Sequence, residues 1–116
     1  MKTLNIFCDL KEGIRDTEFS DALTSLLTSL QAEGRISSFR ITRRMLGLGP
    51  PEIPEWNILI DFENLSQLDD AFGEMAGRAD PTETLHHAVN SKVRKLMISL
   101  YRDFPDPERV RGQEKF

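Results

Sequence analysis

The sequence holds a single cysteine, two histidines and no long apolar run, and each scarcity excludes a class of protein. Because Cys8 has no second cysteine to pair with inside the chain, an intramolecular disulfide is excluded and a reducing cytoplasm is the expected location. Cys8 alternates with apolar residues, so we expect a buried, unreactive thiol. No segment is long enough to span a bilayer as a helix, and the N-terminus lacks the pattern of a signal peptide.

Motifs for common nucleotide, metal and nucleophile sites are also missing. The sequence has no Walker loop, no dinucleotide-binding glycine run, no nucleophile elbow and no cysteine pair for zinc. His86 and His87 are adjacent, so on a helix they point about 100° apart and cannot chelate one metal ion together. We therefore expect no metal site and no tightly held cofactor.

The net charge is acidic, at −4, which argues against nucleic acid or an anionic membrane as a partner because both favour a basic surface. The length of 116 residues, with 39% hydrophobic residues, fits one globular domain. We assign this domain to residues 1–104 and a polar, proline-containing tail to residues 105–116.

Hydrophobic spacing predicts the element order strand, helix, strand, strand, helix, strand. Strands are expected over about residues 3–10, 35–46, 56–63 and 93–102. Helices are expected from a cap at Asp16 or Thr17 to about Gly34, over about residues 64–77, and as a shorter segment of about 81–90 before the last strand. This is the βαββαβ pattern of an α+β, ferredoxin-like fold, with a four-stranded antiparallel sheet and two main helices on one face.

The two faces of the predicted sheet differ in character. One parity is uniformly apolar and is assigned to the helices: Leu4, Ile6, Cys8, Phe39, Ile41, Ile58, Ile60, Phe62, Leu96, Ile98 and Leu100. The other parity, the open face, mixes charged with apolar residues: Asn5, Phe7, Asp9, Arg40, Thr42, Arg44, Asn57, Leu59, Asp61, Lys95, Met97, Ser99 and Tyr101. It is too apolar for a solvated face, and its charges are costly to bury without partners. We therefore expect a second copy to pack its own open face against this one.

With these elements and faces the chain resembles the dimeric α+β barrel superfamily over about residues 3 to 103. That superfamily includes cofactor-independent antibiotic-biosynthesis monooxygenases, stress-responsive barrel proteins and many small families of unknown function. The resemblance implies a homodimer whose sheets enclose a cavity. Monooxygenases of this group use Asn, Trp, Arg and Tyr side chains, and Asn5, Asn57, Arg44 and Tyr101 match in type and parity, whereas Trp56 falls on the helix-facing parity.

The resemblance further implies that the shared cavity binds a small organic molecule. The expected ligand-binding residues are Asn5, Phe7, Arg40, Arg44, Asn57, Leu59, Asp61, Met97 and Ser99. Candidates for catalysis are Tyr101, Asp9 and His86, the last as a proton shuttle or as a lone haem or metal ligand, a role histidine has in some relatives. Arg44 is expected in or beside the cavity, paired with a carboxylate or free to hold an anionic or carbonyl-bearing ligand.

The sequence leaves the activity open between three alternatives. These are a monooxygenase-like enzyme, a non-enzymatic ligand sensor and a structural dimerisation module. RNA recognition, which also uses the βαββαβ order, is disfavoured because only Phe7 offers a ring for base stacking on the first and third strands.

Overall fold

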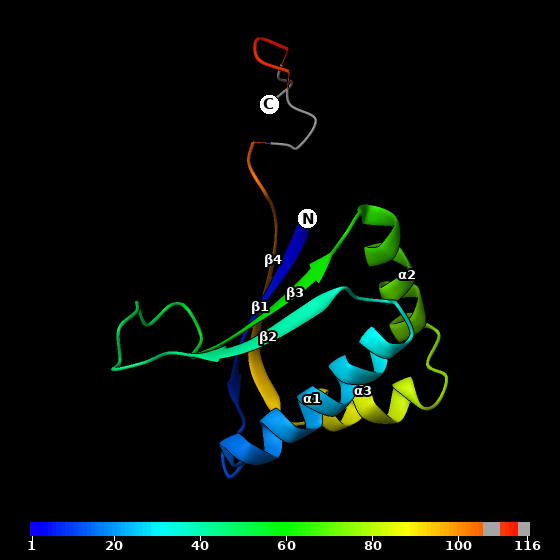
Figure 1. Ribbon diagram of the computed structural model, residues 1–116. Helices are drawn as coiled ribbons and strands as arrows, with labels where there is room; N and C mark the ends of the chain where they lie inside the picture. The colour runs from blue at the N-terminus through cyan, green and yellow to red at the C-terminus, as the bar shows by residue number, and fades with distance from the viewer. Residues whose placement is uncertain (106–109, 114–116) are drawn as a thin grey trace.

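The computed structural model describes residues 1–105 and 110–113, so part of the predicted tail, residues 106–109 and 114–116, lies outside the described residues. The fold is a four-stranded antiparallel sheet with its helices on one side (Figure 1). The elements are β1 (Lys2–Leu10), α1 (Asp16–Ala32), β2 (Ser38–Arg43), β3 (Trp56–Phe62), α2 (Leu65–Ala76), α3 (Thr82–Asn90) and β4 (Val93–Arg102).

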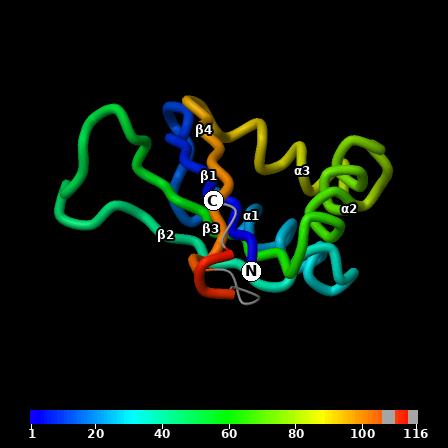
Figure 2. The backbone as a smooth tube through the Cα atoms, turned by 90° about the horizontal axis from the view of Figure 1, so that it is seen from above, coloured from blue at the N-terminus to red at the C-terminus, as the bar shows by residue number. Residues whose placement is uncertain are grey.

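The strand order is β2-β3-β1-β4, so β2 and β4 are the two edge strands of the sheet. All three neighbouring pairs are antiparallel, with Ile6 opposite Ile58 on one side and Ile98 on the other. Seen from above, α1, α2 and α3 all lie on the same side of the sheet (Figure 2). The predicted ferredoxin-like fold is confirmed, and the shorter segment before the last strand is a true helix, α3.

Three element boundaries differ from the prediction. Helix α1 begins at Asp16 with Arg15 as the capping residue, and α3 begins at Thr82 with Pro81 as the capping residue. Strand β2 covers only residues 38–43, because the residues just before it close α1 instead: the N–H of Arg35 donates to the carbonyl of Leu30 at 2.9 Å. This hydrogen bond at the C-terminal end of α1 explains why the strand begins at Ser38 and not at Arg35.

The core lies between α1 and the helix-facing side of the sheet. Five apolar residues that recur at helical spacing on α1 are buried in this core: Phe19, Leu23, Leu26, Leu27 and Leu30. Trp56, at the start of β3, packs edge-on against Phe19 with ring centroids 5.0 Å apart. The helix-facing parity of Trp56 is thereby confirmed.

Arg43 ties this end of the sheet to α1. Its guanidinium lies over the Trp56 ring, 5.1 Å from the centroid, and forms ion pairs with Asp16 at 2.9 Å and Glu55 at 3.3 Å. Hydrogen bonding and charge attraction, first from Glu55 and then from Asp16, raise the pKa of Arg43 above its usual value. Arg43 is therefore a structural arginine of the sheet end.

Two predictions about the core are wrong. The helical spacing of Leu65, Leu68, Phe72 and Met75 predicts that α2 buries all four, but Phe72 remains 48% exposed and Ala71 is the only residue of this helix that is fully buried. On β4, the helix-facing residues Leu96 and Ile98 remain 51% and 56% exposed. The reason is placement, since β4 is an edge strand and α2 lies well away from it (Figure 2).

None of the helices in the described part of the chain is long and apolar enough to cross a membrane.

Candidate ligand-binding site

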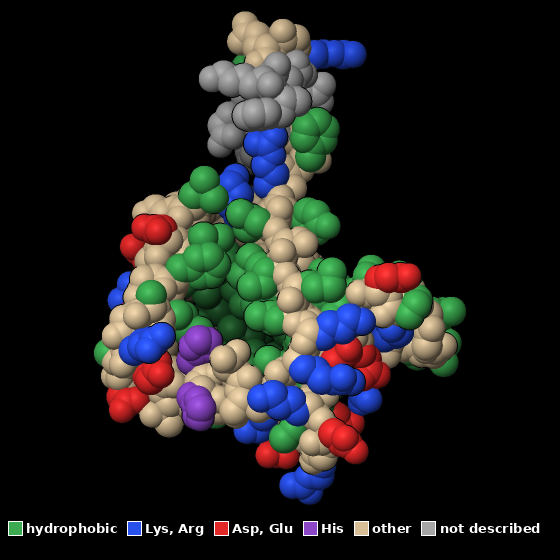
Figure 3. Space-filling view, turned by 180° about the vertical axis from the view of Figure 1, so that it is seen from behind, with side chains coloured by type: hydrophobic (Ala, Val, Ile, Leu, Met, Phe, Trp, Pro, Cys, Tyr) green, Lys and Arg blue, Asp and Glu red, His purple; other side chains and the backbone are tan. Residues whose placement is uncertain are grey.

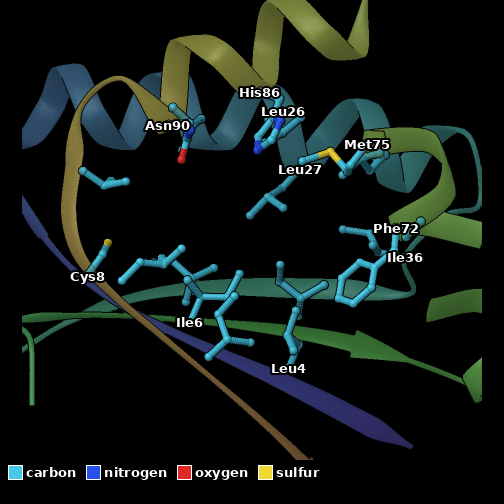
Figure 4. Close-up of a pocket in the computed structure, with 18 of the residues that line it drawn as sticks. Leu4, Ile6, Cys8, Leu26, Leu27, Ile36, Phe72, Met75, His86 and Asn90 are labelled. Atoms are coloured by element: carbon cyan, nitrogen blue, oxygen red, sulfur yellow. The ribbon is translucent and has the colours of Figure 1, made fainter. Parts of the chain in front are cut away.

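A cavity of about 700 Å³ lies between the sheet and the helices, where α2 fails to cover β4. We call it the helix-side hollow, and Figure 3 looks into it from behind. Its floor is the helix-facing side of three strands, and its walls are the three helices (Figure 4). Most of the lining is apolar: Leu4, Ile6, Cys8, Phe19, Leu26, Leu27, Leu30, Ile36, Ile58, Ile60, Phe62, Ala71, Phe72, Met75, Ala76, Val89, Val93, Leu96 and Ile98.

The polar residues of the hollow gather on one wall. They are Arg78, in the connection before α3, and four residues of α3 itself: Glu83, His86, His87 and Asn90. The sheet floor and α1 contribute no charged side chain to the described lining. The hollow therefore offers apolar contact over most of its surface and hydrogen-bonding groups along α3.

His86 and Asn90 point into the hollow. They are four residues apart on α3, so they lie on the same helix face, and both side chains are directed at the space below the helix (Figure 4). Within the described part of the chain, neither side chain has a hydrogen-bond partner. Both can therefore bond to a molecule placed in the hollow.

Helix α3 is held in this position by Thr82. The Thr82 side chain is 1% exposed, and its Oγ1 donates to Oε1 of Glu74 on α2 at 3.2 Å. Oε2 of the same Glu74 pairs with Arg35 at 3.4 Å. Arg35, in the connection between α1 and β2, thus helps to fix the wall that carries His86.

Cys8 closes the end of the hollow near Asn90 and is 1% exposed (Figure 4). Burial, with a smaller contribution from the negative charge of Asp9, raises the pKa of this thiol from 9.0 to about 11. The thiol is therefore protonated at neutral pH, and the reactive thiolate is suppressed. This agrees with the expectation of an unreactive cysteine.

On the opposite side of the sheet, the acids of the open face have partners other than arginine. Asp61 accepts hydrogen bonds from the hydroxyl groups of Thr3, at 2.7 Å, and Ser38, at 2.9 Å. Asp9 accepts the backbone N–H of Glu55 at 2.9 Å. Neither carboxylate is left unbonded, so the open face can be covered at a lower cost than its composition indicates.

The two open-face arginines do not reach these acids. Arg44 donates from Nη2 to the carbonyl oxygens of Pro50, at 3.1 Å, and Ile53, at 2.7 Å. Arg40 is exposed and has no partner among the described residues. Within one protomer, therefore, Arg44 stabilises its own loop, and its place in a dimer cavity stays a prediction.

The remaining predicted site residues do lie together on the open face. Pairing across the sheet puts Phe7 opposite Asn57 and Met97, and Asn5 opposite Leu59 and Ser99. Asn5 is only 7% exposed, and Oδ1 of Asn57 is buried without a hydrogen-bond partner in the described structure.

Tyr101 is 60% exposed near the end of the same face, whereas His86 lies on the other side of the sheet. The three catalytic candidates, Tyr101, Asp9 and His86, are therefore not brought together within one protomer. Sequence reasoning missed Asn90, although its spacing of four residues from His86 was a usable signal.

Among the described residues, no group of three or more His, Cys, Asp or Glu side chains is placed to hold a metal ion.

Comparison with solved structures places the chain among small α+β proteins of the ferredoxin-like fold. A protein from Arabidopsis thaliana, At3g17210, matches with a TM-score of 0.69 at 8% identity, over 89% of this chain and 95% of that one. A dimeric ferredoxin-like protein of unknown function from Jannaschia sp. CCS1 matches with a TM-score of 0.65 at 11% identity, over 88% of this chain and 98% of that one. Another such dimeric protein, from Thermobifida fusca, matches with a TM-score of 0.55 at 12% identity, over 86% and 88%.

At these identities the likeness shows the fold alone. A search of curated proteins finds no match. The model of one family, described as a family of unknown function (DUF6614), matches residues 1–116. The chain belongs to this family.

Proposed function

We propose that the protein binds a small, largely apolar organic molecule in the helix-side hollow, and that it does so as a homodimer joined through its open faces. The observation that carries the proposal is the hollow itself. Its volume of about 700 Å³ falls within the roughly 300–1,000 Å³ typical of small-molecule sites. Such sites combine apolar walls with a few polar groups that orient the ligand, which is the composition found here.

Exposed apolar surface supports ligand binding. Leu96, Ile98 and Phe72 each leave about half of their surface uncovered around the hollow. Covering apolar surface is favourable by roughly 25 cal/mol per Å². An apolar molecule bound there would remove both its own apolar surface and that of the protein from water, and both areas would favour binding. His86 and Asn90 would then meet a hydroxyl or carbonyl group of that molecule.

The dimer is supported by the open face. Phe7, Leu59, Met97 and Tyr101 give this face an apolar centre, and the carboxylates beside it are already hydrogen-bonded. The similar proteins from Jannaschia and Thermobifida are described as dimeric, which favours self-association of this chain too. A dimer of this kind leaves the helix side of each sheet free, so each protomer keeps its own hollow.

Monooxygenase-like chemistry stays a prediction. Its candidates Tyr101 and Asp9 lie on the open face, where a second protomer would enclose them, and His86 would serve the hollow instead. Ligand binding in the hollow requires no such chemistry, so a non-enzymatic sensor fits the same geometry.

The test uses pyrene and 1-hydroxypyrene, two fluorescent molecules that differ by one hydroxyl group. Ile98→Trp adds bulk at a half-exposed position of the lining, and Leu100→Trp adds the same bulk on the same strand parity outside the lining. We expect Ile98→Trp to weaken binding of both molecules at least tenfold and Leu100→Trp to leave it within about twofold. Equal affinities for the two variants would rule out the hollow as the site.

A second pair of variants tests the polar wall. His86→Ala and Asn90→Ala each remove one hydrogen-bonding group. Each should therefore weaken the binding of 1-hydroxypyrene about three- to tenfold, corresponding to about 0.5–1.5 kcal/mol, and leave the affinity for pyrene unchanged. Equal losses for the two molecules would contradict the role of α3 in orienting the ligand.

A further inference from the structure

The connection between β2 and β3, residues 44–55, projects from the sheet on the side away from α1, α2 and α3 (Figure 2). We call it the β2–β3 arm. It carries three of the most exposed large apolar residues of the described chain, namely Met45 at 75%, Leu46 at 81% and Leu48 at 77%. Side chains of this kind are not needed to hold a solvated turn, so they require a separate explanation.

Hydrogen bonds hold the arm in a defined shape. Arg44 donates to two arm carbonyls, those of Pro50 and Ile53, and the backbone N–H of Arg44 donates to the carbonyl of Glu55 at 2.9 Å. Lys95, on β4, donates from Nζ to the carbonyl of Pro51 at 3.1 Å. A connection fixed at both its base and its side loses little conformational freedom when it binds a partner.

Leu46 occupies a backbone conformation that suits glycine better. Its φ is 58°, and the next residue, Gly47, has a φ of 65°, so both central residues of this turn are left-handed. Glycine tolerates this region freely, whereas leucine adopts it only at a cost in energy because of its Cβ. A leucine is nevertheless present, and most of its surface is left uncovered by the described residues of its own protomer.

The area of the open face alone is small for a stable dimer. Four strands spaced about 4.8 Å apart, with a rise of about 3.3 Å per residue over about seven to eight residues, present a face of about 500 Å². Two such faces, taken as flat, cover about 1,000 Å² in total, which is at the low end for specific interfaces, whose typical buried accessible surface is roughly 1,600 Å². An apolar arm on the same side of the sheet is placed to supply the missing area.

We infer that the β2–β3 arm packs against a second copy of this chain, so that each protomer of the dimer holds its partner with Met45, Leu46 and Leu48. The inference rests on the proposed dimer and adds to it the segment that makes it stable. The occupant is a second copy because the arm and the semi-apolar open face share one side of the sheet, and one partner packed there can cover both.

The test compares Leu48→Ser and Leu46→Gly with Leu65→Ser, a matched loss of an exposed leucine on α2, on the other side of the sheet. The dimer dissociation constant is measured by sedimentation equilibrium, and folding by circular dichroism. Both arm variants should raise this constant at least tenfold with folding intact, whereas Leu65→Ser should leave it within about twofold. Leu46→Gly is the more demanding variant because glycine suits the backbone conformation, so weaker dimerisation cannot be blamed on strain.

The outcomes separate the two proposals. A wild-type dimer whose dissociation constant is unchanged in both arm variants refutes the arm and leaves the open-face dimer standing. A wild-type protein that sediments as a single chain at micromolar concentration refutes the dimer and the arm together.

Discussion

The buried thiol of Cys8 makes the stability of the fold depend on pH in the alkaline range. Burial, with Asp9 as the second cause, raises the pKa of Cys8 from 9.0 to about 11 in the folded protein. Well below pH 9, at pH 7 for example, the thiol is protonated in both states and contributes no pH dependence. Above pH 9 the unfolded chain releases its proton while the folded chain keeps it, so the folded state loses stability as pH rises.

The magnitude follows from the size of the shift. Each pKa unit corresponds to about 1.4 kcal/mol, so two units correspond to about 2.7 kcal/mol in total, of which about 1.9 kcal/mol is lost between pH 9 and pH 11 and the rest just outside that interval. From pH 9 to pH 10 alone the expected loss is about 1 kcal/mol, since the unfolded thiol is only half ionised at the lower limit.

Urea unfolding at pH 7, 9 and 10 measures this loss, with Cys8→Ala as the reference that removes the thiol. All other titratable groups are present in both proteins, so the difference between the two free energies of unfolding isolates Cys8. We expect the stability advantage of wild type over Cys8→Ala to shrink by about 1 kcal/mol from pH 9 to pH 10. An advantage that is constant across the three pH values would refute the argument that the thiol stays protonated inside the hollow.

Two further substitutions test the open face and the arm. Leu59→Glu places a carboxylate from each protomer in the proposed interface, so the dimer dissociation constant should rise at least 100-fold. The control Leu65→Glu, on α2, should change this constant less than threefold. Similar dissociation constants for the two variants would argue against the open face as the interface. Gly49→Ala would set a Cβ 2.5 Å from Nε of Arg44, so the arginine must move and lose its hydrogen bonds to Pro50 and Ile53. The free energy of unfolding measured in urea should fall by about 1 kcal/mol. When Arg44 is already replaced by alanine, the substitution Gly49→Ala should cost less than about 0.3 kcal/mol. If Gly49→Ala costs the same with and without Arg44, the contact between position 49 and Arg44 is contradicted.

The fold could be predicted from the sequence because alternation and helical spacing determine which side of each element is apolar. Leu4, Ile58 and Phe62 alternate with polar residues, and this alone assigns them to the helix side, where they are buried. The same argument assigned Leu96 and Ile98 correctly to that side but failed on their burial. Parity states the direction of a side chain and carries no information on whether another element covers it.

The charged residues of the open face show a second limit of the pattern. Arg44 shares a parity with Asp9 and Asp61, and parity alone cannot say which groups each of them bonds: within one protomer Asp61 is bonded by two hydroxyl groups and Arg44 by two carbonyls. Small hydroxyl residues at positions 3 and 38 lie directly opposite Asp61 in the register, closer than any arginine. Such pairings depend on register, which the strand patterns alone did not specify.

The helix-side hollow shows why a candidate site can be hidden in an ordinary helical pattern. Phe72 and Met75 recur on α2 at the spacing of a core-facing helix, and that spacing is the same whether the face meets a sheet or a cavity. The distinguishing signal lies in α3, where His86 and Asn90 interrupt the apolar side of a short helix four residues apart. His86 is half-buried and Asn90 is exposed, so both stay within reach of water or of another molecule that enters the hollow.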